Sequence, residues 1–537
     1  MTTSRLFRHG AGTLFRTAAH LPPRQIAYQL RRRLGGPARR PKATSLEGVT
    51  GLLARMPPPT PEGEPSSDGV CLLGQPPHDP LRAGWDPPVG MLYLYTLHYH
   101  GWLQRLAPER ALATIEHWIA NHTAGVGWEP YPTAVRALHW LGWLSGHIDN
   151  LDGMTRRRLL ASLAGQLRHL ERHLEHHLDG NHLWTDLAAL ACGALALDGP
   201  RAHLLASAVA RFAAVTSDQL ALDGFHRERT PSYHCLLAEQ LAGVVALGPE
   251  RAEPRAAPVL RDNLARMLAV LPAFTHPDGD VALLGDSQRG LVSPAALAVR
   301  CGTSLSQGTD YNAPASGLFR RAWGPWTLLW NAGGLGMPQQ VGHIHGDWLG
   351  YELSLGGERV VVDAGVGTYE VGPERTYARS TRAHNTVTVG PGDRDQHELW
   401  ASHRIGGRGE LCDLSFATSE LSAGVRGFRA AAVHHRRLAW DGHVLRCIDR
   451  VVPDHGEPVP ATMRIHLPQT CALAVDGPRV RVTTPGGRSF VVHGPVDLRW
   501  QVTAVPGWTA MSSPAPRHCL ALPVGPGGLE VVFALDA

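Results

Sequence analysis

The spacing of apolar residues changes near residue 310, and this change constrains the possible folds more than any other feature. From about residue 91 to 310, apolar side chains recur every three to four positions, which is typical of amphipathic or buried helices. From about residue 315 onward they form short β-branched runs bounded by glycine and proline, as strands do. Helices followed by strands indicate separate domains. We therefore predict a multidomain α+β protein with paired helices first and an antiparallel β-sandwich second.

Length and composition are consistent with a folded protein of more than one domain. A chain of 537 residues exceeds one ordinary hydrophobic core. Hydrophobic residues make up 43% and charged residues 18%, which excludes a disordered or fibrous chain. We predict a basic arm and proline-rich linker at 1–90, a helical domain at 91–312 and a sheet domain at 313–537.

The N-terminal arm is basic. Ten Arg or Lys residues and no acidic residue precede Glu47, and the remaining chain carries 41 basic against 47 acidic residues. Such an arm could contact anionic lipid, an acidic polymer or nucleic acid, or it could be a solvated or docked helical arm. The sequence leaves these alternatives open, and we carry forward only a peripheral contact through the arm.

The sequence also bears on compartment. No run of about 18 apolar residues occurs, so we expect no transmembrane segment. The N-terminus lacks the apolar core of a secretory signal, which favours the cytoplasm. The eight cysteines form no C-x-x-C pair, which predicts free and mostly buried thiols.

Four polar clusters interrupt the apolar pattern, two in each predicted domain. They are GNHLW at 180–184, DGFHRERTPSYH at 223–234, GHIHGDWLGYELSLGGERVVVDAG at 342–365 and YARSTRAHNTVTV at 377–389. Asn181 opens an apolar helix and could be its N-cap. In the second cluster Glu228 and Arg229 could be a surface ion pair. Because a nearby arginine lowers the pKa of a phenol, Tyr233 is equally a candidate for proton transfer.

The last two clusters contain residue types that bind metals. His345, Asp363 and His384 offer two imidazoles and a carboxylate, which suit zinc or a similar divalent ion with a fourth position for water. The alternative is a set of unrelated polar residues at strand ends. His343 lies two positions before His345 and therefore on the same side of an extended strand. If the second histidine binds a metal, His343 is free for catalysis.

Taken together, these clusters resemble those of a known family. They follow LYLYTLHYHGWL at 92–103 and GWEPYPTAVRALHW at 127–140, with HPDGDVALLGDS at 276–287 between the second and third clusters. In this order they resemble the heparinase II/III-like polysaccharide lyases, including related alginate lyases with an (α/α) toroid and a β-sandwich. The resemblance covers most of residues 91–410. It implies that the helical domain is an (α/α) toroid.

The resemblance implies a lyase that cleaves a uronic-acid-containing polysaccharide by β-elimination. By position in the matching motifs, Asn181 is expected to contact the substrate carboxylate, with His182 beside it. Tyr233 is expected to be the general base and acid. His343 is expected to neutralise charge or take the proton. We therefore expect an acidic polysaccharide as partner, with no nucleic acid and no organic cofactor.

The resemblance also implies a metal site and substrate contacts. The metal ligands would be His345, Asp363 and His384, and the ion would be divalent, with zinc preferred, in a structural or organising role. Four further side chains are expected to bind substrate, namely Trp184, Glu228, Arg229 and Arg379. Trp184 stands where leucine is common in the family, so it could narrow or add a sugar subsite. Each arginine could equally form a structural ion pair.

Two other functions remain open. A glycoside hydrolase on the same scaffold needs two carboxylic acids facing a cleft, and Asp223 and Glu228 could supply them. A non-catalytic glycan-binding protein of polysaccharide assembly is the second alternative. A lyase would suit turnover of a bacterial exopolysaccharide, and such a substrate would favour the periplasm or the exterior over the cytoplasm.

Overall fold

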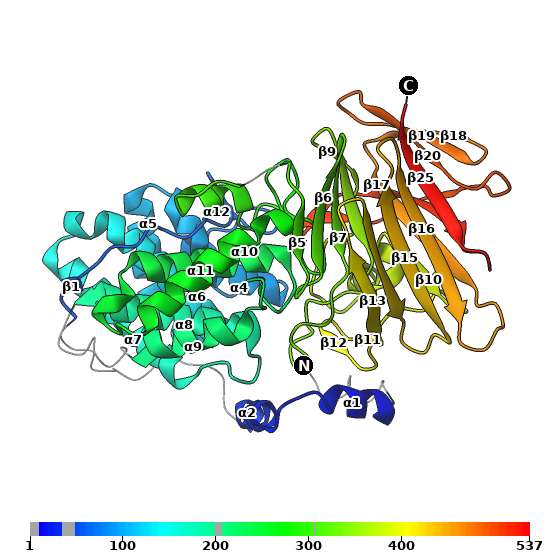
Figure 1. Ribbon diagram of the computed structural model, residues 1–537. Coiled ribbons are helices and arrows are strands. Elements are labelled where there is room, and N and C mark those ends of the chain that lie inside the picture. Colours follow the sequence, from blue (N-terminus) through cyan, green and yellow to red (C-terminus); the bar gives the residue numbers. More distant parts are fainter. Residues whose placement is uncertain (1–9, 35–48, 199–206, 306–307, 537) are drawn as a thin grey trace. The chain divides into compact units, whose positions relative to one another are not determined.

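The computed structural model describes residues 10–34, 49–198, 207–305 and 308–536 (Figure 1). The chain divides into two compact units. The helical unit comprises the described parts of 22–220 and 235–268, and the sheet-rich unit those of 1–21, 221–234 and 269–537. Helices precede antiparallel sheets along the chain, which confirms the predicted α+β class. The predicted boundary at 312 lies inside the sheet-rich unit, which also includes the first described residues.

Amphipathic and buried helices build the helical unit. Helix α6 is buried from Pro130 to Ser145 and packs against α4, α7 and α8, while α8 packs against α9. Proline at the first helical position starts α5 and α6, where its missing N–H leaves no hydrogen bond unmade. The helices are α2 (Pro23–Leu34), α3 (Pro80–Ala83), α4 (Met91–Tyr99), α5 (Pro108–Asn121), α6 (Pro130–His147), α7 (Gly153–Arg172), α8 (Gly180–Ala196), α9 (Ser207–Gln219), α10 (Pro231–Ala246) and α11 (Ala256–Ala269).

Short strands join parts of the helical unit. Strand β1 (Gly51–Leu52) pairs with β4 (Leu197–Asp198), and β2 (Glu64–Ser66) pairs with β3 (Gly69–Cys71). The first turn of α10, from Pro231 to His234, belongs to the sheet-rich unit. No helix among the described residues is long and apolar enough to cross a membrane.

Three antiparallel sheets of four or more strands form most of the sheet-rich unit. The five-stranded sheet runs β5 (Tyr311–Ala313), β6 (Leu318–Trp323), β7 (Trp326–Asn331), β8 (Tyr351–Leu355) and β9 (Glu358–Val361). The eight-stranded sheet runs β13 (Glu410–Phe416), β14 (Glu420–Arg426), β15 (Ala432–Trp440), β16 (Leu445–Pro453), β25 (Leu529–Leu535), β20 (Ser489–His493), β19 (Arg479–Thr483) and β18 (Ala472–Asp476). The four-stranded sheet runs β10 (Val387–Val389), β17 (Ala461–Pro468), β24 (Arg517–Pro523) and β21 (Gln501–Val505).

The sheets share one apolar core. One cluster of buried side chains takes residues from all three sheets, as in a β-sandwich. Along β19 buried and exposed positions alternate, whereas every residue of β7 and β8 is buried. A strand that alternates has one face toward water, and a strand buried throughout is covered on both faces. The five-stranded sheet therefore includes the most enclosed strands, and β8 follows directly after the GHIHGDWLG segment.

Smaller elements complete the sheet-rich unit. They are α1 (Ala11–Ala18), α12 (Pro294–Arg300), α13 (Pro373–Arg379), β11 (Leu399–Trp400), β12 (Arg404–Ile405), β22 (Trp508–Ala510) and β23 (Ser513–Pro514). None of the eight cysteines is in a disulfide and five are buried, as predicted. Half of the basic arm cannot be placed, because Arg5, Arg8, Arg39, Arg40 and Lys42 lie outside the described residues.

Candidate functional site

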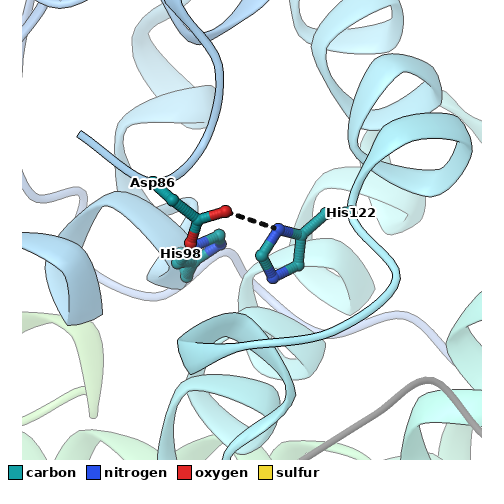
Figure 2. Close-up of side chains that lie close together, drawn as sticks. All are labelled: Asp86, His98 and His122. Carbon is teal, nitrogen blue, oxygen red and sulfur yellow. Dashed lines mark ion pairs between the residues drawn. The ribbon is translucent and has the colours of Figure 1, made fainter.

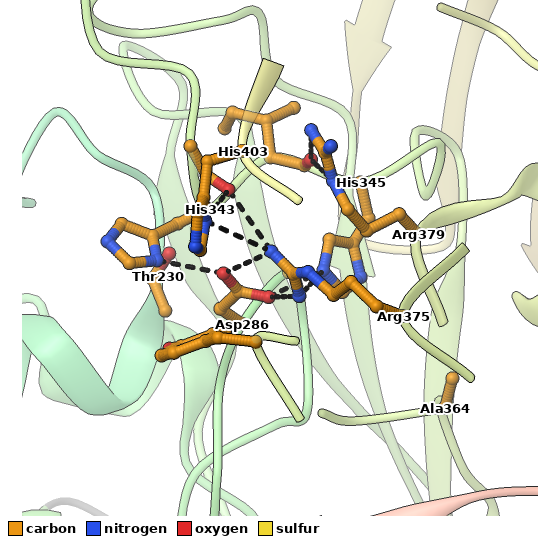
Figure 3. Close-up of polar contacts among 12 residues, drawn as sticks. Thr230, Asp286, His343, His345, Ala364, Arg375, Arg379 and His403 are labelled. Carbon is orange, nitrogen blue, oxygen red and sulfur yellow. Dashed lines mark hydrogen bonds and ion pairs between the residues drawn. The ribbon is translucent and has the colours of Figure 1, made fainter. Parts of the chain in front are cut away.

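Asp286 lies at the centre of a polar cluster in the sheet-rich unit (Figure 3). Its Oδ2 is 2.8 Å from His343 Nδ1, and its Oδ1 is 2.7 Å from His345 Nε2. Both carboxylate oxygens also accept from the Arg375 guanidinium, with 2.9 Å between Nη2 and Oδ2. Burial opposes a charge here, yet Arg375 and the two histidines hold the pKa of Asp286 well below its usual range. Asp286 is therefore ionised and accepts every bond it makes.

An ionised carboxylate fixes where the two histidines carry their protons. Because Asp286 can only accept, His343 donates from Nδ1 and His345 donates from Nε2. The other nitrogen of His343, Nε2, lies 3.7 Å from Glu228 Oε2. The other nitrogen of His345, Nδ1, is buried and has no hydrogen-bond partner among the described residues. Burial lowers the pKa of His345 to about 4, so this nitrogen presents a lone pair at neutral pH.

Tyr233 lies against this cluster. Arg229 adopts the left-handed conformation with φ 62°, and Pro231 then starts α10, which places Tyr233 in the first turn of the helix. The Tyr233 ring is 4.5 Å from the His343 ring, and its hydroxyl is 2.9 Å from the hydroxyl of Tyr369. The structure thus brings together the two residues expected to move the proton, Tyr233 and His343.

Electrostatics differ between the partners of Tyr233. Burial and the neighbouring phenol raise the pKa of Tyr369 well above its ordinary value, so Tyr369 keeps its proton. Burial opposes the cationic form of His343, but the hydrogen bond to Asp286 and the charge of Glu228 raise its pKa overall. His343 is 11% exposed and is therefore not sealed from solvent. Tyr233 therefore faces one phenol that keeps its proton and one imidazole whose pKa is raised.

Asn181 and His182 lie in the first turn of α8 in the helical unit. The N-cap of this helix is Asp179 with φ 60°, so Asn181 is inside the helix and is not the cap. His182 Nδ1 is 2.7 Å from Glu175 Oε2, and its ring lies 4.4 Å from that of Tyr131. A carboxylate partner holds His182 in one orientation at the start of the helix.

Trp184 does not present a sugar-stacking face. Its side chain is 0% exposed, and its ring packs edge-on against Phe212 at 5.4 Å, within the helical unit. Stacking on a sugar needs an accessible ring face, so the predicted subsite at Trp184 is wrong. The residue is part of α8, which is buried along nearly its whole length.

The other three predicted substrate contacts are also buried. Arg229 donates to the Ser316 carbonyl and, at 2.7 Å, to Asn331 Oδ1. Arg379 donates to the Ile344 carbonyl at 3.2 Å. Glu228 is buried beside His343. These contacts hold the segments that carry the cluster in place. We do not propose that these side chains bind substrate directly.

His345, Asp363 and His384 partly fit a divalent ion. His384 Nδ1 is 2.8 Å from Asp363 Oδ1, and its Nε2 is buried without a hydrogen-bond partner among the described residues. The rings of His345 and His384 are 5.4 Å apart, and each has one such nitrogen. Burial opposes the Asp363 charge, but His384 lowers the pKa of Asp363 overall. Two imidazole nitrogens without partners and an ionised carboxylate form a donor set that zinc accepts.

A different group has the closer spacing. Within the described ranges, three ligand atoms from His, Cys, Asp or Glu all lie within 4.8 Å of one another only at Asp86, His98 and His122 (Figure 2). Asp86 is 3.9 Å from His98 Nε2 and 3.7 Å from His122 Nδ1. The indole of Trp118 donates to His98 Nδ1 at 3.1 Å.

That indole decides against a metal at the helical cluster. An indole N–H only donates, so His98 Nδ1 accepts, and the proton of the neutral ring is on Nε2, the atom that faces Asp86. A metal would have to displace this proton. Two residues, Asp86 and His122, would then be the remaining ligands, one fewer than the three that zinc sites keep. The cluster in the helical unit therefore has the ligand spacing of a metal site. The group in the sheet-rich unit has the donor atoms that a metal requires.

Three residues of the cluster were not predicted from the sequence. Asp286 lies in the HPDGDVALLGDS stretch, whose residues suggested no role by themselves. Tyr369 and Arg375 lie in GVGTYEVGPERTY at 365–377, a turn-rich stretch without a recognisable motif. Arg375 is fully buried and α13 carries it, so only its contacts with Asp286 reveal a role.

Known proteins share this fold. Residues 308–514 match the family model described as heparinase II/III-like, C-terminal. The crystal structure of heparinase III has a TM-score of 0.67 at 15% identity and covers 86% of this chain and 80% of that one. Heparan sulfate lyase HepC from Pedobacter heparinus has a TM-score of 0.56 at 14% identity and covers 96% and 88%. No curated protein matches the chain. Residues 308–514 therefore form a heparinase II/III-like C-terminal domain, as the resemblance predicted, on a chain with the toroid-plus-β-sandwich fold of heparinase III.

Proposed function

We propose that the protein is a polysaccharide lyase that cleaves a uronic-acid-containing polysaccharide by β-elimination. The observation that carries the proposal is the grouping of Tyr233 with His343 and Tyr369 beside the ionised Asp286. The matching family model and the shared fold support it.

Elimination needs a base that later acts as an acid. The Tyr233 oxygen, as phenolate, takes the proton from C5 of the uronate. The C5 electron pair forms the C4–C5 double bond, the bond from C4 to the glycosidic oxygen breaks, and that oxygen takes the proton from Tyr233. Because the pKa of Tyr369 is raised, Tyr369 donates to the Tyr233 oxygen and stabilises the phenolate. General acid–base catalysis of this kind contributes about 10²–10⁴-fold.

The substrate carboxylate must be neutralised while C5 loses its proton. Negative charge builds next to a group that is already negative, so donors and cations are needed there. His343 has a raised pKa, and Asn181 and His182 are the donors that the motif match assigns. Charge stabilisation by a single positioned donor typically contributes about 2.7–4 kcal/mol.

Asp286 is a positioning residue in this proposal. It holds His343 through Nδ1 and His345 through Nε2, so the orientations of both rings depend on one carboxylate. A carboxylate behind a metal-binding histidine fixes the ring and its tautomer.

A divalent ion, with zinc preferred, would be held by His345, Asp363 and His384. When bound, it would supply a fixed positive charge that offsets Asp363 and tethers the segment carrying His343. Elimination adds no water, so the lyase does not require a metal-activated nucleophile.

Substrate choice starts from the similar structures. Those enzymes are named for heparin and heparan sulfate, so heparan sulfate is the first candidate and acidic bacterial exopolysaccharides are the second. The hydrolase alternative is weakened because Asp223 already accepts from Ser316 N at 2.8 Å and from Ser316 Oγ at 2.6 Å.

The test uses purified protein and a panel of uronate polysaccharides. A lyase raises the ultraviolet absorbance of the conjugated double bond, and the rise disappears in Tyr233→Phe. Tyr311→Phe, a tyrosine of β5, is the matched control and keeps activity. New reducing ends without absorbance would instead identify a hydrolase, and binding without turnover would identify a glycan-binding protein.

A further inference from the structure

The N-terminal helix α1 contacts the hairpin at residues 398–407, and the tip of this hairpin contacts the candidate active site. Thr13 Oγ1 donates to Glu398 Oε1 at 2.9 Å, and Arg16 binds both oxygens of Glu398, with 2.8 Å from Nε to Oε2. Thr17 Oγ1 accepts from Trp400 Nε1 at 3.0 Å. All of these residues belong to the sheet-rich unit.

Each side-chain oxygen of Glu398 accepts two hydrogen bonds. Besides Thr13 and Arg16, its Oε2 accepts from the Gly407 amide at 2.7 Å. The Arg16 hydrogen bond is the main reason that the pKa of Glu398 falls to about 2. Since a depressed carboxyl pKa keeps the charge above that value, the pair is intact across the physiological pH range. Multiple charge-assisted bonds are stronger than a single exposed ion pair.

The hairpin at residues 398–407 has little support of its own. Its strands β11 and β12 have two residues each and pair only with each other. Isolated two-stranded hairpins are marginally stable. Contacts from outside the hairpin must therefore hold it: Ile405 packs against Val341 and Ile344. Helix α1 supplies polar contacts at the end that carries Glu398.

The tip of the same hairpin contacts the site. The Ser402 carbonyl accepts from Arg375 Nε at 3.0 Å, and the Ser402 hydroxyl donates to the Tyr369 carbonyl. The His403 ring lies 5.1 Å from Tyr369 and 6.3 Å from His343 (Figure 3). The hairpin thus links α1 at one end with the partners of Asp286 and Tyr233 at the other.

We propose that α1 is a positioning element of the active site, and that Arg16 and Glu398 fix the 398–407 hairpin so that its tip holds Tyr369 and Arg375. Arg16, one of the ten basic residues of the arm, is committed to this contact and is not available to an anionic partner. The kinetic part of this inference rests on the proposed lyase activity, whereas the structural part does not.

The experiment compares the full chain with Arg16→Ala, Glu398→Gln and the double variant. We expect amide hydrogen exchange in peptides covering 398–407 to quicken by about tenfold, because local opening becomes easier. Exchange in β16 stays unchanged. Because the two residues act through one contact, the double variant resembles either single variant. Arg16→Lys restores part of the protection.

On the polysaccharide that the protein cleaves, kcat falls by about three- to tenfold while KM changes by less than about twofold, since the hairpin holds catalytic groups rather than substrate. The matched control is the ion pair of Arg437 and Glu420, which are 2.7 Å apart on β15 and β14. Arg437→Ala leaves both readouts unchanged.

Unchanged exchange in the hairpin of the double variant would overturn the proposal, and so would faster exchange with unchanged kcat. If the wild type cleaves no polysaccharide, the proposed function fails, but the exchange result still decides whether α1 holds the hairpin.

Discussion

Two clusters of histidine and aspartate, one in each unit, differ in which imidazole nitrogen carries the proton. At Asp286 a buried carboxylate accepts from His343 and His345, and the opposite nitrogen of His345 is left with its lone pair. At Asp86 the Trp118 indole donates to His98, and the nitrogen facing the carboxylate carries the proton. The same residue types thus give one group suited to acid–base chemistry and metal binding, and one hydrogen-bonded network.

The helical unit repeats the indole arrangement. Trp85 donates to His117 Nδ1 at 3.1 Å, and Trp140 donates to His100 Nδ1 at 3.0 Å. Burial lowers the pKa of His100 well below its ordinary value. His98 and His100 are fully buried, and as neutral rings that accept from tryptophan they are part of a packed core. The hydrogen-bond partners of an imidazole therefore say more about its function than the distance between candidate ligands does.

Asp286→Asn should cause the largest change. The amide cannot accept from two histidines and an arginine at once, and it leaves Arg375 buried without a counter-charge. Loss of one partner of a buried ion pair costs about 3–5 kcal/mol. Urea unfolding should show that loss, and lyase activity should fall with it.

Asp86→Asn is the matched control, because it makes the same substitution in the cluster of the helical unit. Asp86 is 61% exposed and its contacts are 3.7–3.9 Å long, so the free energy of unfolding should change by less than about 1 kcal/mol. Equal losses in the two variants would contradict the distinction between the clusters.

Metal content distinguishes the clusters directly. We expect elemental analysis after dialysis against zinc to find the ion in the wild type, and His345→Ala or His384→Ala to lose it. His122→Ala should retain it. Retention in His345→Ala together with loss in His122→Ala would move the site to the helical cluster.

Trp118→Phe should have a smaller effect, on stability alone. It removes the donor to His98 and part of a buried ring that lies 3.9 Å from the Arg136 guanidinium. Leaving a buried acceptor without its donor costs about 1–3 kcal/mol. Thermal unfolding measures this loss, and lyase activity should be kept at temperatures well below unfolding, where both proteins are folded. A loss of activity without a loss of stability would contradict a structural role.

One carboxyl group in each unit should contribute to stability with an opposite dependence on pH. Burial, and next the charge of Glu239, raise the pKa of Glu62 in the helical unit to about 7. The folded state then holds a proton that the unfolded state releases, so stability falls as pH rises from about 4.5 to 7. Asp278 of the sheet-rich unit has a pKa lowered to about 2, chiefly by Arg359 against the effect of burial, so its contribution is lost only in acid.

Glu62→Gln should remove the first effect. Because Glu62 is half-buried, the expected effect is about 1 kcal/mol. Relative to wild type, the free energy of unfolding of Glu62→Gln should be higher at pH 8 than at pH 5 by this amount. Urea midpoints at the two pH values measure it. A variant that kept the slope of the wild type would assign the titration to another group.

The sequence predicted the parts that depend on local pattern. Apolar spacing identified helices and then strands, and the motif match placed Tyr233 and His343 in one group, which the structure does bring together. Trp184 was misjudged, because a motif cannot tell that α8 is buried on nearly all sides. Asp286, Tyr369 and Arg375 were missed because their roles arise from contacts between residues 57 to 136 positions apart. The docking of α1 spans more than 380 residues and leaves no local signal.

The most direct test follows the conjugated double bond by ultraviolet absorbance when the protein meets heparan sulfate and acidic exopolysaccharides. We expect the absorbance to rise with the wild type and with His122→Ala, and not to rise with Tyr233→Phe. Full activity in Tyr233→Phe would contradict the proposed mechanism, because a residue other than Tyr233 would then have to be the base.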